Sequence, residues 1–166
     1  MSQVAVNELL FLMDNAFERS RPHSLLNNLS SVTEAEWSAA DHEGRTIREM
    51  VRHLAAAKQV YDNQAFGDGS LLWPQMQERI LDPDKTMADD IEWLHHGHEQ
   101  LRASLASLDD DELGKQRPVH MGGTLETRVI VAIMIEHDVY HAGEINHLRA
   151  TIQGNDYWRG REPRKD

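Results

Sequence analysis

The sequence contains no cysteine, and this absence excludes several kinds of chemistry. Disulfide cross-links, cysteine zinc sites and thiol nucleophiles are all ruled out, so any sulfur chemistry must use a thiol from outside the chain. No run approaches the roughly 18 to 20 apolar residues that span a bilayer, so we expect no membrane-spanning helix and no membrane partner. The first residues, MSQVAVNELLFLMDN, lack the basic start and apolar run of a secretory signal, so we expect a cytoplasmic protein.

Positive charge is also scarce. The chain has 17 Lys and Arg against 28 Asp and Glu, a net charge of -11 with histidine neutral. This balance repels a phosphate backbone, so we expect no nucleic acid partner. Histidine, in contrast, is abundant, with ten in 166 residues, and an imidazole can carry protons, bind a metal or simply face solvent. The length predicts a single domain over residues 1–166, with about 155–166 as a loosely ordered polar tail.

Apolar residues recur at helical spacing along most of the chain, and strand-like alternation is weak. The pattern predicts helices over about 4–29 with a break at Pro22, over 47–66, from near residue 86 to 108, and over 124 to about 153. Thr46 with Glu49 and Thr86 with Asp89 have the spacing of capping boxes. We therefore predict an all-α fold, an antiparallel four-helix bundle. Residues 67–85 form a long loop between helices two and three, with room for a turn of helix around PQMQERI.

The stretch IEHDVYHAGEINH, residues 135–147, places imidazoles and acids directly after the apolar run VIVAIMI. On a helical wheel, His137, His141 and Glu144 fall inside the arc of the apolar residues of the last helix. The two histidines are four apart, so their rings lie one turn above the other. Two buried neutral imidazoles without partners would be costly, whereas a divalent metal accepts a lone pair from each. Histidines at this spacing also occur by chance on exposed helices.

A third metal ligand must come from another helix, and His53 in MVRHLAAAKQVY is the candidate. It lies on the flank of its helix's apolar stripe, beside alanines that leave room for an ion; a boundary residue bonded to a carbonyl is the open alternative. Glu144 could orient a histidine ring, act as a general base or a fourth ligand, or pair with an arginine of a neighbouring helix. Asp138 points away from His137, so it belongs either at the surface or behind the ligands.

Other acid and histidine patterns fit metal sites less well. HDVYH resembles the metalloprotease motif H-E-x-x-H, but aspartate reaches less far than glutamate and no further ligand follows. EWLH and EINH have the E-x-x-H spacing of di-iron bundles, yet Glu92 and His147 fall off the apolar stripes of their helices.

The remaining histidines are expected to have structural or surface roles. In HHGH, His98 lies on the apolar stripe and is expected to be a hydrogen-bonded core residue, while residues 95 and 96 face solvent. His23, His42 and His120 lie in predicted loops, where the default is the surface.

Two sets of apolar and aromatic residues bear on the surroundings of the site. Tyr61 and Tyr140 could line its opening, although aromatic residues at helical spacing usually belong to the core. In the last helix the apolar residues extend beyond one core-facing stripe, to Val129, Val131, Ile135 and Val139. A homodimer interface would give this second face a partner, as would another helix of the same chain.

The segments TIREMVRHLAAAKQVYDNQAFGDG and EHDVYHAGEINHLRATIQGND together resemble the DinB/YfiT-like proteins, and the likeness extends to RPHSLLNNLSSVTEAEW. The resemblance implies a four-helix bundle whose metal sits on one histidine of the second helix and an H-x-x-x-H pair of the last. It therefore implies His53, His137 and His141 as ligands of one divalent ion, nickel or zinc first, with iron or manganese in some members. It also implies a homodimer, and for some relatives the transfer of small bacterial thiols such as bacillithiol or mycothiol.

Three histidine ligands leave a coordination position open, which is the pattern of a catalytic site. A metal there lowers the pKa of bound water towards about 7, or binds a thiol as thiolate. We therefore expect a metal-dependent enzyme that activates water or a low-molecular-weight thiol for hydrolysis or transfer. The alternative is a non-catalytic, stress-related metal-binding protein whose ion mainly holds the helices together.

Overall fold

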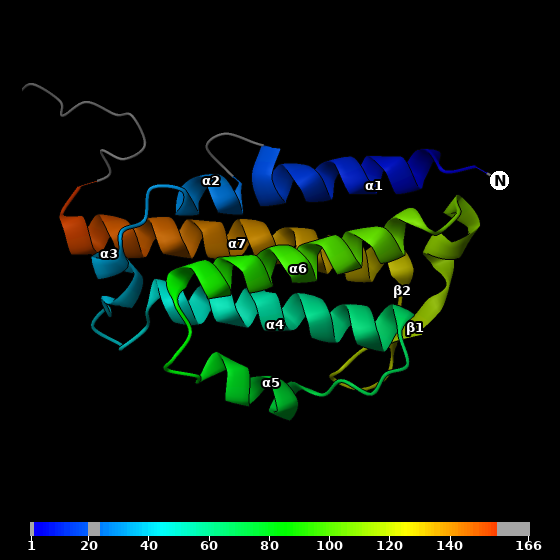
Figure 1. Cartoon of the computed structure of the whole chain (residues 1–166). Helices are drawn as coiled ribbons and strands as arrows, with labels where there is room; N and C mark the ends of the chain where they lie inside the picture. Colours follow the sequence, from blue (N-terminus) through cyan, green and yellow to red (C-terminus); the bar gives the residue numbers. More distant parts are fainter. Residues whose placement is uncertain (1, 20–23, 156–166) are drawn as a thin grey trace, which may run out of the picture.

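The computed structural model describes residues 2–19 and 24–155, and it is mostly helical (Figure 1). The elements, in chain order, are α1 (Val4–Asp14), a π-helix η1 (Asn15–Arg19), α2 (Leu25–Leu29), α3 (Glu34–Ser38), α4 (Ile47–Phe66), α5 (Trp73–Ile80), α6 (Met87–Ala106), a 3₁₀ helix η2 (Asp110–Gly114), β1 (Gln116–Pro118), β2 (Thr124–Glu126) and α7 (Thr127–Gln153). Within the described residues, no helix combines the length and apolar character that crossing a membrane requires. The break predicted at Pro22 and nearly all of the predicted tail lie outside the described residues.

Side-chain caps fix the start of two of the long helices. The backbone N–H of Glu49 donates to the Thr46 hydroxyl, and the N–H of Thr46 donates to the Glu49 carboxylate 3.0 Å away. Thr86 and Asp89 make the same reciprocal pair at the start of α6. These contacts satisfy N–H groups that lack a partner within the helix, which confirms both predicted starts. At its far end α7 stops at Gly154, whose φ of 69° is the left-handed conformation that glycine adopts readily.

Helices α4 and α6 run in the same direction, whereas the sequence pattern predicted antiparallel neighbours. The Arg52 guanidinium pairs with Asp90 at one level, and Gln59 donates to Gln100 further along, so residue numbers rise together in both helices. This arrangement is possible because the segment between them contains α5 and leads the chain back along the bundle (Figure 1). A long crossover of this kind allows parallel neighbours in a helical bundle. Helix α7 does run antiparallel to α4, since His53 faces His137 while Arg45 faces Glu144.

A short β-hairpin replaces the loop expected before the last helix. β1 and β2 pair antiparallel, with Gln116 opposite Glu126 and Pro118 opposite Thr124. The turn between them includes Gly122 and Gly123, with φ of 89° and 80°, in the region that residues with a side chain rarely adopt. As a result α7 begins at residue 127 rather than 124, because the three residues before it belong to β2.

The buried side chains form two clusters along the bundle. One contains residues of η1, α2 and α3, of the first halves of α4 and α6 and of the second half of α7. The other contains residues of α1, of the end of α4, of the second half of α6 and of the first half of α7. Helices α4 and α6 approach closely at Gly97, where an added Cβ would lie 3.2 Å from the Ala55 carbonyl oxygen. Packing of α4 against both α6 and α7 holds the middle of α4 and α7 in a fixed register, and the candidate site lies there.

Candidate metal centre

Three imidazoles converge between α4 and α7. Nε2 of His137 lies 3.2 Å from Nε2 of His53 and 3.0 Å from Nε2 of His141. Two nitrogens bound at about 2.0 to 2.1 Å to one ion are about 3.0 Å apart in octahedral and about 3.3 Å apart in tetrahedral geometry. These two spacings therefore match those that a shared metal ion imposes on neighbouring ligands. Among the described residues this is the group of histidines and acids whose ligand atoms, all within 4.8 Å of one another, could hold an ion.

The environment of the three rings keeps them neutral. Burial, together with the neighbouring His141 and His53 rings, lowers the pKa of His137 to about 3. Burial likewise lowers the pKa of both other rings, although nearby Glu144 opposes the shift in each case. A neutral imidazole has one nitrogen with a free lone pair, which is the form that binds a metal. At neutral pH the cluster thus offers three lone pairs to a metal ion, rather than three positive charges that would repel it.

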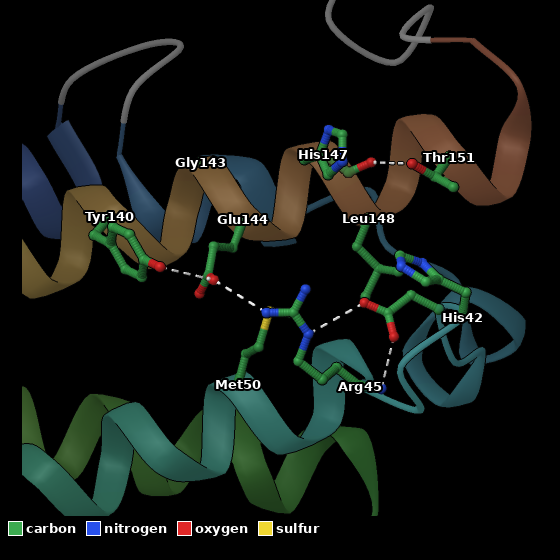
Figure 2. Close-up of a pocket in the computed structure, with 10 residues that line it drawn as sticks. His42, Arg45, Met50, Tyr140, Gly143, Glu144, His147, Leu148 and Thr151 are labelled. Carbon is green, nitrogen blue, oxygen red and sulfur yellow. Dashed lines mark hydrogen bonds and ion pairs between the residues drawn. The ribbon is translucent and has the colours of Figure 1, made fainter.

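Glu144 lies behind His141 and contacts the nitrogen that faces away from the cluster. Oε2 of Glu144 is 2.6 Å from Nδ1 of His141. On the other side of the carboxylate, the Tyr140 hydroxyl donates to Oε1 at 3.1 Å, and Arg45 lies 3.5 Å from the same oxygen (Figure 2). A carboxylate beside Nδ1 favours the tautomer with the proton on that nitrogen, which leaves Nε2 free to accept a metal. Of the roles considered for Glu144, the structure shows the salt bridge to an arginine, and it places the carboxylate against the His141 ring, where an orienting role is possible.

A buried ion pair lies next to the ligands. Nζ of Lys58 is 2.7 Å from Oδ2 of Asp138, and both side chains are 1% exposed. Burial raises the pKa of the Asp138 carboxyl, and the lysine charge opposes that rise. Of the two places expected for Asp138, the surface is therefore wrong: the side chain is buried and its pair with Lys58 links α7 to α4.

Two cavities reach the triad from different sides. The aromatic cavity, about 490 Å³, is lined by His53, Ala57, Tyr61, Trp73, His120, Met121, Ile133, Met134 and His137. The polar cavity, about 290 Å³, is lined by Arg45, Glu49, Met50, His53, Tyr140, His141 and Glu144. The polar cavity shares Arg45, Met50, Tyr140 and Glu144 with a larger hollow of about 400 Å³ that continues towards His42 and His147 (Figure 2). The histidine cluster is therefore open to small molecules on both sides.

A family model describes much of the chain. The DinB superfamily matches residues 16–145, a span that includes the whole histidine triad. This chain belongs to the DinB superfamily. The resemblance seen in the sequence is thereby confirmed for the family. A comparison of this DinB-superfamily chain with curated proteins gives no match.

His120 is the site residue that sequence reasoning missed. It was expected at the surface, but in this DinB-superfamily protein it is half-buried in the wall of the aromatic cavity, where its ring lies 4.8 Å from Tyr61 and 6.0 Å from Trp73. The signal available was the pair of glycines after it, which marks a hairpin turn and brings the loop back over α4. Tyr61 and Tyr140 do line the openings, as the sequence allowed.

The other histidines differ in burial. His42 is exposed, as predicted, and His23 lies outside the described residues. His98 is buried, as predicted, and stacks on Phe17 with ring centres 3.7 Å apart, but its Nδ1 has no hydrogen-bond partner among the described residues. His147 is exposed.

Residues 95 and 96 were both predicted to face solvent. His96 is exposed, whereas His95 is partly buried because its ring packs against Phe17. Glu92 of the E-x-x-H motif is exposed, as its position off the apolar stripe indicated.

Proposed function

We propose that His53, His137 and His141 bind one divalent transition metal and that this DinB-superfamily protein is a metal-dependent enzyme. The observation that carries the proposal is the convergence of three Nε2 atoms from two helices, with separations of 3.0 and 3.2 Å. Three neutral imidazoles facing one point have no good arrangement of protons among themselves, because the central nitrogen of His137 faces two others. A cation placed between them satisfies all three lone pairs.

The surroundings favour catalysis over a purely structural ion. A structural zinc site is closed by four protein ligands, whereas three ligands leave room for water or substrate. Here the triad borders the aromatic cavity through His53 and His137 and the polar cavity through His53 and His141. When bound, the metal would supply a water or small thiol of lowered pKa at neutral pH. We therefore propose transfer or hydrolysis using water or a low-molecular-weight thiol, with a non-catalytic metal-binding role as the alternative.

The chain's own residues would prepare the site for that chemistry. His53, His137 and His141 offer lone pairs, and Glu144 holds His141 in the tautomer that binds. The contacts of Glu144 thus support a positioning role for this residue. Nickel or zinc is proposed first, with iron or manganese possible, because imidazole ligands suit several divalent ions.

The proposed frame for this site is the four-helix bundle of DinB type, made of α1, α4, α6 and α7.

We also propose that the protein forms a homodimer. The supporting observation is that Val129 and Val139 of α7 are 38% and 47% exposed, an apolar surface beyond the core-facing stripe. Val131 on the same helix is buried and Ile135 partly so, and both therefore serve the core. Sedimentation equilibrium of the purified protein tests this, and a monomer at all concentrations would remove the dimer.

Metal analysis and calorimetry test the metal site directly. The metal-free protein is titrated with nickel, zinc and manganese, and we expect one ion per chain for at least one of them. His137→Ala should abolish binding, whereas His96→Ala, on the exposed face of α6, should leave it unchanged. If none of the three ions binds, both the enzyme and the alternative are refuted, and a helical scaffold with buried histidines remains.

Thermal unfolding separates the two candidate functions. If the ion acts only in catalysis, the metal should raise the wild-type melting temperature by no more than mass-action binding requires, and His137→Ala should stay folded without activity. If the ion mainly holds α4 and α7 together, the metal should raise the wild-type melting temperature strongly, and the variant should lose that increase in full.

A further inference from the structure

Among the described residues, the wall of the aromatic cavity beside the triad has no acidic or basic side chain apart from its histidines. We propose that this cavity binds an uncharged aromatic or similarly planar group, the part of the substrate that lies next to the metal ligands. This proposal deepens the proposed function, because the cavity shares His53 and His137 with the triad.

Four aromatic side chains that line the space contact one another. Trp73 and His120 lie at 27° to each other with centres 6.0 Å apart, close to a stacked arrangement. Tyr61 meets His120 edge-on, at 75° and 4.8 Å, and Trp73 meets His53 at 65° and 5.2 Å. Both stacked and edge-on contacts at such distances are favourable between π systems. A planar guest in the cavity would have these aromatic rings in its wall.

The remaining wall is made of small and flexible apolar side chains. Ala57 leaves space on α4, while Ile133 and Met134 of α7 and Met121 of the hairpin close the floor and rim. Methionine adapts its shape and makes favourable contacts with aromatic rings. The volume of about 490 Å³ lies within the range of about 300 to 1,000 Å³ that is typical of small-molecule sites.

Charge distribution separates the two cavities. In the metal-free protein, a carboxylate or phosphate in the aromatic cavity would lose its hydration without gaining an opposite charge from the side chains that line it, which is costly. Burial lowers the pKa of His120 and raises that of Tyr61, so both are neutral at neutral pH. The polar cavity instead contains Arg45, Glu49 and Glu144. The uncharged ring of a substrate therefore belongs on the Trp73 side, and a polar part that pairs with Arg45 or with the carboxylates belongs on the Glu144 side.

Binding of two matched probes to the metal-free protein tests this proposal. 2-Naphthol is uncharged at neutral pH, and naphthalene-2-sulfonate has the same ring system with a negative charge. Equilibrium dialysis, read by probe absorbance, should show 2-naphthol binding at least about tenfold more tightly. Equal or tighter binding of the sulfonate, or no binding of 2-naphthol up to millimolar concentration, would overturn the proposal.

Variants locate the bound probe. Ala57→Leu fills the cavity and should weaken 2-naphthol binding about tenfold or more, because the ring loses the space it occupies. Ala103→Leu makes the same change on the exposed face of α6 and should have no effect. Trp73→Ala removes one aromatic wall and should also weaken binding, which keeps the test valid if the first variant does not fold. Unchanged affinity in both cavity variants would show that the probe binds elsewhere.

The result does not depend on the metal. His141 does not line the aromatic cavity, so His141→Ala should lose the metal and keep its affinity for 2-naphthol. Loss of metal binding alone would leave the cavity proposal standing, and loss of probe selectivity alone would leave the metal proposal standing.

Discussion

The buried pair between Lys58 and Asp138 leads to a quantitative prediction. Both side chains are 1% exposed, their charged atoms are 2.7 Å apart, and the second carboxylate oxygen of Asp138 has no hydrogen-bond partner among the described residues. Lys58→Met therefore leaves a buried carboxylate without its counter-charge. Removal of one partner from a buried pair costs about 3 to 5 kcal/mol, a large share of the about 5 to 15 kcal/mol by which a domain is stable.

Urea unfolding of the metal-free protein measures this loss. With a slope of about 2 kcal/mol per molar, the midpoint of Lys58→Met should fall by about 2 M. Asp138→Leu should cause a comparable loss, but the double variant should recover most of it, since two apolar side chains need no counter-charge. Lys115→Met is the matched control, because Lys115 lies 2.6 Å from Glu112 but is 61% exposed, and its midpoint should barely change. Single variants as stable as this control, or a double variant that loses the sum of both, would refute the reasoning.

Further predictions concern the metal ligands, pH dependence and helix packing. Glu144→Gln should weaken zinc binding about 10- to 100-fold in competition with a coloured chelator, whereas Glu136→Gln, exposed on the same helix, should not; equal affinities would contradict the positioning role. Burial lowers the pKa of His98 to about 3. Below about pH 6.5 this imidazole therefore binds a proton in the unfolded chain but stays neutral in the folded chain. Stability contributed by the neutral ring is therefore complete above that pH and falls by about 2 kcal/mol at pH 5, a loss that His98→Gln should abolish in urea titrations. Gly97→Leu should destabilise the protein by about 1 to 3 kcal/mol in thermal or urea unfolding, because α4 leaves no room there, while Gly143→Leu faces open space and should not.

Local signals in the sequence predicted the helices well because they depend on neighbouring residues alone. Thr46 with Glu49 located the start of α4, and Thr86 with Asp89 located the start of α6. The spacing of His137 and His141 predicted that their rings share one face, and their contact confirms it. His53 could not be assigned from spacing alone, because its role depends on which helix packs opposite; the family resemblance implied it.

Features that depend on distant parts of the chain were not accessible in the same way. A helical wheel gives the direction of Asp138 but not the identity of Lys58, which approaches it from another helix. The parallel course of α4 and α6 is set by the crossover through α5, and periodicity contains no information on direction. His120 reaches the cavity because the hairpin folds back over α4, and three-residue strands are too short to show alternation.

The crossover through α5 also affects how a small molecule would enter and leave the aromatic cavity. Helix α5 has no fully buried residue, and its two ends are tied to α4 by side-chain bonds from Gln64 to Leu71 and from Arg52 to Ile80. Segments with so little buried surface open far more often than the bundle unfolds, so amide hydrogens around Trp73 should exchange much faster than those of α4. Because the indole is attached to α5, local opening of this segment would widen the aromatic cavity while α4 and α7 stay packed.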